Sequence, residues 1–145
     1  LYSSALRRAR ETAAAIGAAL ALEPRIEPDL REMDHGDWEG LTKEEILARW
    51  PAEFAAFETD PVRVRRPGGD SYGDLAARLC PVLDALAARH RGERIVIVSH
   101  GGPIRLMLSR ILEIPLTERE RLGVTNARWF PVEWEDGVWR MAPGD

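Results

Sequence analysis

The clearest pattern along the chain is a short apolar run that leads into a helix. Residues 95–99 are mostly β-branched, and the run is too continuous for a surface strand and too short for a buried helix. It predicts a central strand of a parallel sheet. After His100, two glycines permit a sharp turn, and Pro103 suits the first helical position. The predicted helix has apolar residues at helical spacing, namely Ile104, Met107, Leu108 and Ile111.

Three further helices are predicted before the middle of the chain. Ser4 or Ser3 suits the N-cap of a helix whose apolar stripe consists of Leu6, Ala9, Ala13, Ile16 and Leu20. Thr42 and Glu45 have the spacing of a capping box, and the helix that they open is expected to end near Trp50 and Pro51. A second short helix containing Phe54 and Phe57 should follow.

The second half of the chain adds a long helix and a hairpin. Ser71 and Asp74 form another capping-box pattern, and the helix behind it is expected to bend at Pro81. Its apolar side comprises Leu75, Leu79, Val82, Leu83 and Leu86. Residues 126–141 predict a closing hairpin with Asp136–Gly137 at the turn. The aromatic residues of this hairpin are interpreted as packing residues: Trp129, Phe130, Trp134 and Trp139.

The length, net charge and cysteine content of the chain limit the ligands and partners that it is expected to bind. The chain has 145 residues, enough for one domain with a core, and it contains no apolar stretch of membrane-spanning length. A net charge of −4 gives no general attraction for nucleic acid, so an anionic ligand would need local positive groups. The single cysteine, Cys80, excludes an intramolecular disulfide and is interpreted as core filler. We expect a soluble, cytoplasmic protein without nucleic-acid or membrane partners.

The first residues resemble the end of a strand that enters a helix cap. Leu1 is not an initiator residue, and nothing precedes Leu1–Ser4 that would form the start of that strand. We therefore expect that the sequence begins inside a domain and that an upstream segment carries further chemistry.

Candidate anion-binding groups gather near two predicted helix starts. Arg7, Arg8 and Arg10 lie in the first turns of the N-terminal helix, where the macrodipole favours anions over cations. Such a placement fits a bound anion, although three solvated arginines would also explain it. His100 lies at the carboxyl end of a strand and before a helix N-terminus, where open α/β sheets bind anionic ligands.

Two other segments have dense chemistry. Residues 30–40 contain four carboxylates, those of Glu32, Asp34, Asp37 and Glu39, together with His35 and Trp38. The loop at residues 60–69 carries a basic cluster, Arg63, Arg65 and Arg66, that either contacts a substrate anion or is a solvated face. The three histidines have no metal-ligand spacing, so no metal site is expected.

One alternative is a serine esterase. The segment Gly69-Asp70-Ser71-Tyr72-Gly73 matches the G-x-S-x-G pattern of a nucleophile elbow. The preceding residues do not form a buried strand, however, and Ser71 is better explained as a helix cap. This remains a distant third interpretation.

The candidate site residues also suggest phosphoryl transfer. That reaction needs cationic or hydrogen-bonding groups around the phosphoryl oxygens, a nucleophile in line, and an acid for the leaving oxygen. Arg8 and His100 can supply the first, and a carboxyl group of residues 30–40 can supply the acid. The residues alone do not choose among the four carboxylates, and they supply no obvious nucleophile.

Four ordered segments resemble motifs of the histidine phosphatase superfamily, also called phosphoglycerate mutase-like. The first is Ser3-Ser4-Ala5-Leu6-Arg7-Arg8-Ala9, with Thr12-Ala13 behind it. The second is Leu30-Arg31-Glu32 with Gly36 to Gly40, and the third is Pro67-Gly68-Gly69-Asp70-Ser71. The fourth is Val98-Ser99-His100-Gly101-Gly102. Their order and spacing give the resemblance its weight.

The resemblance implies a three-layer α/β/α sandwich around a mostly parallel sheet, formed by one domain over residues 1–145 whose N-terminal strand is missing. It places phosphate binding on Arg8, His100 and Gly101, and acid/base catalysis on Glu32. The family's Arg-His-Gly segment, which carries the nucleophilic histidine, is absent from this sequence. Asp70 stands where the family usually has Glu, which is expected to change how the pocket is braced.

The implied activity is metal-independent hydrolysis of a small phosphorylated metabolite through a phosphohistidine, without a cofactor. The short distance in sequence between Gly40 and Pro67 resembles the compact phosphatase branch rather than the cofactor-dependent phosphoglycerate mutases. A mutase and a catalytically inactive phosphate-ligand-binding member remain alternatives. A homodimer is left open.

Overall fold

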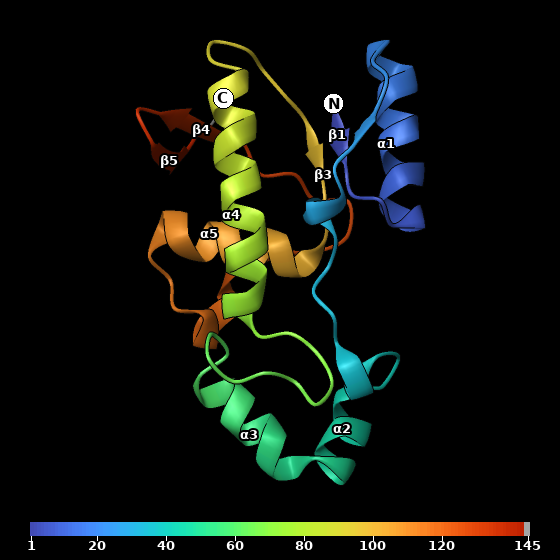
Figure 1. Cartoon of the computed structure of the whole chain (residues 1–145), viewed down its shortest axis with the longest axis vertical. Helices are drawn as coiled ribbons and strands as arrows, with labels where there is room; N and C mark the ends of the chain where they lie inside the picture. The colour runs from blue at the N-terminus through green and yellow to red at the C-terminus, as the bar shows by residue number, and fades with distance from the viewer. Residues whose placement is uncertain (144–145) are drawn as a thin grey trace.

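The structure is a computed structural model, and it describes residues 1–143. Its order of elements alternates strands with helices in the first part and ends in a hairpin (Figure 1). The strands are β1 (Tyr2–Ser3), β2 (Arg25–Ile26), β3 (Ile97–Val98), β4 (Val132–Glu135) and β5 (Val138–Met141). The α-helices are α1 (Arg7–Leu20), α2 (Lys43–Arg49), α3 (Pro51–Thr59), α4 (Tyr72–Arg89) and α5 (Gly101–Leu112). Short 3₁₀ helices are η1 (Pro28–Leu30), η2 (Gly36–Trp38) and η3 (Leu116–Leu122).

The parallel sheet has the order β2-β1-β3 in the described part of the chain. Helix α1 lies on one side of it, and α4 and α5 lie on the other (Figure 1). This layering confirms the predicted α/β class. The strand predicted at residues 95–99 is shorter than expected, and among the described strands it pairs with β1 alone. Its residues are half-buried in the described part of the chain.

Local sequence signals set most helix boundaries correctly. Thr42 and Glu45 form the predicted capping box at α2, and Ser71 and Asp74 form the one at α4. Helix α5 begins at Gly101, two residues before Pro103, with His100 at its N-cap. Asp136 and Gly137, both with positive φ, close the β4–β5 hairpin as predicted.

The cap predicted for the first helix is wrong. The N-cap of α1 is Leu6, which makes no side-chain cap hydrogen bond. Ser4 lies before the helix, and its hydroxyl accepts a hydrogen bond from the Leu6 N–H at 3.2 Å. The apolar stripe also ends earlier than predicted, since Ala9 and Ala13 are buried but Leu20 is exposed.

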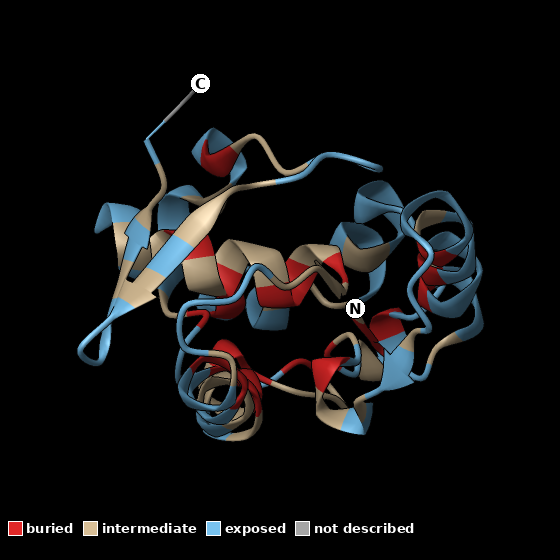
Figure 2. Ribbon diagram, turned by 90° about the horizontal axis from the view of Figure 1, so that it is seen from above, coloured by how far each residue is buried: buried red, intermediate tan, exposed pale blue. Residues whose placement is uncertain are grey.

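The core lies between the sheet, α4 and the loop that follows η1, and Figure 2 shows its buried residues along the inner side of α4. Leu30, Leu75 and Leu79 are almost fully enclosed, which is a large favourable contribution because apolar surface leaves water. Trp129 is 78% exposed, so its predicted packing role is wrong, whereas Trp139 packs against the core. No helix of the described residues is long and apolar enough to cross a membrane.

Candidate functional site

The predicted site residues meet where β1 and β3 end and α5 begins. Arg8 Nε lies 3.2 Å from His100 Nδ1. Both carboxylate oxygens of Glu32 lie 3.1 Å from the Gly102 N–H, and one of them also accepts from the Met33 N–H at 3.0 Å. Three segments far apart in the sequence therefore deliver a guanidinium, an imidazole and a carboxylate to one helix N-terminus.

His100 is held as a neutral imidazole. Its Nδ1 accepts the hydrogen bond from Arg8, so Nε2 carries the proton and donates to the Ser4 hydroxyl, 2.8 Å away. Burial lowers the pKa of His100, and the positive charges of Arg8 and Arg78 act in the same direction, while the Glu32 carboxylate opposes them. The ring is 7% exposed, and its orientation is fixed from both sides.

Ser4 is a residue of this site that the sequence analysis misjudged. Its hydroxyl is completely buried and links the first turn of α1 to His100. The Ser-Ser pattern before a helix signals a cap, so sequence reasoning assigned it a local role. The signal that distinguishes the two roles is the parallel pairing of β1 with β3, which aligns Ser3 with Val98 and places Ser4 beside His100.

Only one of the three N-terminal arginines faces the site. Arg7 pairs with Glu11 on the exposed side of α1 at 2.7 Å, and Arg10 is exposed. Arg8 alone reaches His100. Arg7 and Arg10 are therefore surface arginines, whereas Arg8 contacts His100.

Among the four carboxylates of residues 30–40, Glu32 alone contacts the start of α5. Asp34 accepts a hydrogen bond from the Gly36 N–H within its own loop, and Asp37 and Glu39 are exposed. Two side chains outside the motif position Glu32. Arg78 of α4 donates to the carbonyl oxygens of Asp29, Arg31 and Glu32, and Ser99 donates to the Leu30 carbonyl at 2.7 Å.

The turn at residues 67–70 packs directly against the loop that carries Glu32. A Cβ on Gly69 would lie 2.6 Å from the Asp34 carbonyl oxygen, so this approach requires glycine. Asp70 completes the contact, because its carboxylate accepts from the Asp34 N–H at 3.0 Å and its own N–H donates to the Asp34 carbonyl at 2.9 Å. Asp70 thus holds this loop through the backbone groups of Asp34.

The geometry around Ser71 does not support an esterase. Its hydroxyl donates to Asp74 at 2.7 Å and accepts the Asp74 N–H, as a helix cap does. Among residues 1–143 no histidine is hydrogen-bonded to Ser71. The described residues also contain no group of three or more His, Cys, Asp or Glu side chains arranged to hold a metal ion.

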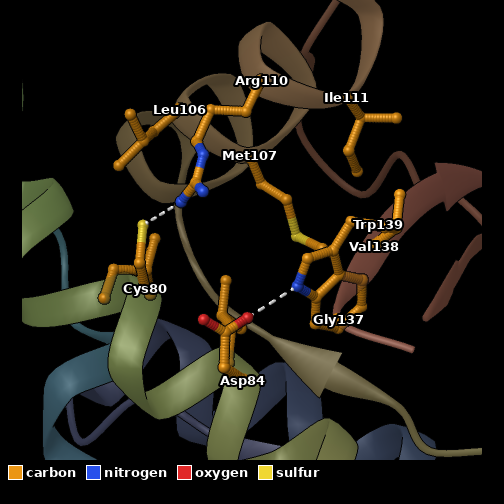
Figure 3. A pocket seen from close by; sticks show the side chains of 11 residues that line it. Cys80, Asp84, Leu106, Met107, Arg110, Ile111, Gly137, Val138 and Trp139 are labelled. Atoms are coloured by element: carbon orange, nitrogen blue, oxygen red, sulfur yellow. Dashed lines mark hydrogen bonds between the residues drawn. The ribbon is translucent and has the colours of Figure 1, made fainter. Parts of the chain in front are cut away.

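A cavity of about 220 Å³ lies elsewhere, between α4, α5 and the turn of the hairpin (Figure 3). Cys80 is half-buried on its wall, where Arg110 contacts the thiol, so the cysteine is not core filler as predicted. On another part of the wall, Trp139 donates to Asp84 at 2.9 Å. None of the predicted site residues lines this cavity.

The chain belongs to the histidine phosphatase superfamily (branch 1), whose family model matches residues 1–143. It is 32% identical over 136 residues to phosphoserine phosphatase 1 of Hydrogenobacter thermophilus, covering 94% of this chain and 64% of that protein. It is 36% identical over 144 residues to a metal-independent phosphoserine phosphatase of Arabidopsis thaliana, covering 94% and 60%. The chain thus spans less than two thirds of the length of these two curated relatives.

Solved structures give the same assignment. The chain matches a mycobacterial glucosyl-3-phosphoglycerate phosphatase in complex with inorganic phosphate at a TM-score of 0.79 and 34% identity. The match covers 99% of this chain and 74% of that one. The same enzyme in complex with VO₃ gives a TM-score of 0.79. The family and the fold predicted from the four motifs are confirmed.

Proposed function

We propose that the protein is a metal-independent phosphomonoester hydrolase that acts on a small phosphorylated metabolite through a phosphohistidine intermediate. The observation that carries this proposal is the convergence of Arg8, His100 and Glu32 at the start of α5. A guanidinium, an imidazole and helix N–H groups suit the surroundings of a phosphoryl group, and the adjacent carboxyl group suits proton transfer.

Each residue then has a defined role. Arg8, His100 and the N–H of Gly101 hold the phosphoryl oxygens. A histidine outside residues 1–145 attacks phosphorus and forms the P–N bond, while Glu32 in its acid form gives its proton to the departing oxygen. Water then attacks phosphorus and gives a proton to the Glu32 carboxylate. The P–N bond breaks, and phosphate leaves.

The nucleophile is proposed to lie outside this sequence, because the resemblance assigns it to an Arg-His-Gly segment that residues 1–145 lack, and two of the histidines present are engaged elsewhere. His90 is hydrogen-bonded to the Tyr2 hydroxyl and to Glu93, both at 2.8 Å, on a different part of the molecule. His100 has both ring nitrogens engaged. The greater length of the curated relatives leaves room for a further segment that supplies this histidine.

A cofactor-dependent mutase is the second candidate, because one relative, 41% identical over 112 residues, is a phosphoglycerate mutase-like protein of Arabidopsis thaliana. The short segment between Gly40 and Pro67 and the phosphatase names of the other relatives favour hydrolysis. The third candidate is a family member that binds phosphorylated ligands but does not hydrolyse them.

The test is hydrolysis of p-nitrophenyl phosphate in the presence of a chelator, with protein whose N-terminus has been verified by intact mass. We expect turnover that the chelator does not reduce and that His100→Ala abolishes. Arg63→Ala is the matched control, because Arg63 is exposed and pairs with Asp60. Full turnover in His100→Ala would remove that residue from the site, and phosphoryl return to a second acceptor instead of water would favour the mutase.

A further inference from the structure

Arg66 is a buried cation that lacks an acidic partner. It is 7% exposed, although arginine is seldom buried to this degree without a paired charge. Among residues 1–143 no carboxylate forms an ion pair with it. Its one side-chain hydrogen bond to the described residues is donated to the Asp70 carbonyl oxygen at 3.2 Å. Because burial of an unpaired charge is costly, an apolar side chain would suit this position better if stability alone mattered.

The other arginines of the loop at residues 60–69 have acidic partners. Arg63 is exposed and pairs with Asp60. Arg65 is also exposed, and it pairs with Asp74, a member of the capping box of α4. The basic cluster expected from the sequence is therefore divided, with two arginines on the solvated face and Arg66 buried.

Three aromatic rings surround the Arg66 guanidinium. Its central carbon lies 4.3 Å from the centroid of the Phe57 ring. The centroids of the Trp38 and Tyr72 rings are 5.9 and 6.0 Å away. The face of an aromatic ring attracts a cation, and the attraction is strongest where water is excluded. The rings belong to η2, α3 and α4, so the guanidinium is held against three separate elements.

The turn of residues 66–70 is closed by Arg66 itself. The Asp70 carbonyl oxygen accepts from the Arg66 guanidinium at 3.2 Å and from the Arg66 backbone N–H at 3.5 Å. In the opposite direction, the Gly69 N–H donates to the Arg66 carbonyl at 2.9 Å. The position of the guanidinium among the rings therefore determines where Asp70 lies.

The same turn is bonded to the loop that carries Glu32. Asp70 exchanges two hydrogen bonds with the backbone of Asp34, at 3.0 and 2.9 Å. The Asp37 N–H donates to the Pro67 carbonyl at 2.9 Å. Asp34 follows Glu32 by two residues, so a shift of the turn is transmitted to the backbone of Glu32. A small misplacement of a catalytic group is enough to lower its rate contribution strongly.

We propose that Arg66 is a positioning residue for Glu32. The aromatic rings hold its guanidinium, the guanidinium holds the turn of residues 66–70, and the turn holds the loop from which the Glu32 carboxylate reaches α5. Arg66 acts through these backbone contacts rather than on the reacting atoms. The role explains an unpaired charge at a place where it does not favour stability. This inference rests on the proposed function, in which Glu32 protonates the leaving oxygen.

The test uses two substrates that differ in their need for a proton. The p-nitrophenolate of p-nitrophenyl phosphate leaves without much help, whereas the alkoxide of n-butyl phosphate needs the acid. The readout is the ratio of kcat/KM for the aryl ester to kcat/KM for the alkyl ester. Arg66→Met should raise this ratio by roughly 10-fold, because a misplaced Glu32 costs more on the alkyl ester. A loss of folded protein would lower both values equally and leave the ratio unchanged.

Arg119→Met is the matched control. Arg119 lies over the same Phe57 ring at 5.5 Å and pairs with Glu58, but it makes no hydrogen bond to the turn of residues 66–70 among the described residues. Its replacement removes a cation from the same aromatic cluster, so the ratio should stay at the wild-type value. An unchanged ratio in Arg66→Met would overturn the proposal, as would an equal rise in Arg119→Met.

Phe57→Leu provides a second variant for the case that Arg66→Met does not fold. It removes the ring nearest to the guanidinium and keeps Arg66 itself. The ratio should rise here as well, and an unchanged ratio in this folded variant would overturn the proposal.

A readout without turnover separates this inference from the proposed function. If the wild type hydrolyses neither ester, the proposed function fails, and amide hydrogen exchange still reports the position of Glu32, because its carboxylate binds the Gly102 N–H at 3.1 Å. Exchange at Asp34 and Gly102 should be faster in Arg66→Met, or in Phe57→Leu where the former does not fold, and unchanged in Arg119→Met. Wild-type exchange rates at both amides of the folded variant would overturn the positioning role.

Discussion

Helices α4 and α5 both begin directly after an extended N-cap residue, but their first turns are closed in different ways. At α4, Ser71 and Asp74 satisfy each other within four residues. At α5, the N-cap His100 makes no side-chain cap, and the Gly102 N–H is bound by Glu32, which is 70 residues away in sequence. A helix start whose N–H groups are bound by neighbouring residues, as at α4, has a structural role. At α5 the partner comes from a distant segment, so the His100 side chain at the N-cap is free of a capping role.

Among the variants considered, replacement of Glu32 should have the largest effect on kcat. Glu32→Gln keeps the size of the side chain and removes the acid, so we expect kcat to fall by about 10²- to 10⁴-fold on p-nitrophenyl phosphate or an alkyl phosphate. The decrease should be larger on the alkyl phosphate, because its leaving oxygen needs the proton. Asp34→Asn is the matched control in the same loop. A dead Asp34→Asn beside an active Glu32→Gln would contradict the assignment.

Gly102→Ala should have the second-largest effect on kcat. A Cβ there would lie 2.2 Å from Glu32 Oε1, so Gly102→Ala must displace the carboxylate. We expect a loss of about 100-fold in kcat, as for other misplaced catalytic groups. Gly101→Ala should lose less, because its Cβ meets the flexible end of Arg105 instead. Steady-state kinetics of both variants provides the measurement, and a Gly102→Ala as active as Gly101→Ala would contradict the contact.

The pH dependence of stability should also separate the two helix starts. Burial lowers the pKa of His100 in the folded state below its usual value of about 6.5, so the unfolded chain binds more protons just below that pH. The free energy of unfolding should therefore fall as the pH decreases below about 6.5. His35, whose pKa is also lowered by burial, adds to this slope. Urea midpoints between neutral and mildly acidic pH should show a weaker dependence in His100→Gln, and an identical dependence would contradict it.

The smallest expected effect is at the locally closed helix. Ser71→Ala removes the cap of α4, so the free energy of unfolding should decrease by about 1 kcal/mol and Tm by roughly 3 °C. The kcat on p-nitrophenyl phosphate should stay at the wild-type level, and no esterase activity should be present to lose. Thermal denaturation and an ester assay check both parts, and ester hydrolysis that disappears with the serine would revive the alternative.

Sequence reasoning succeeded where the determinants are local. The capping boxes of α2 and α4, the hairpin turn at Asp136–Gly137 and the placement of His100 before a helix each depend on a few consecutive residues. The order of strands was not accessible in this way. The apolar run before His100 does not reveal which strand lies next to it, and the structure shows that Tyr2–Ser3 is a parallel neighbour.

The site shows the same limit. Position alone indicated Arg8 and His100, but it could not choose Glu32 over three nearby carboxylates, because that choice depends on which side chain reaches Gly102. It also missed Ser4 and Arg78, whose roles come from contacts 96 and 46 to 49 residues away. The family resemblance supplied Glu32, and the structure supplies a physical reason for it.

The central claim is that Arg8 and His100 together bind a phosphate group at the start of α5. Nitrogen NMR of the three histidine rings during a titration with inorganic phosphate tests it most directly, because His90 is an internal control held by Tyr2 and Glu93. The account predicts saturable shifts of the His100 ring nitrogens, their loss in Arg8→Met, and no change at His90. A His100 ring that does not respond to phosphate, or responds equally in Arg8→Met, would contradict it.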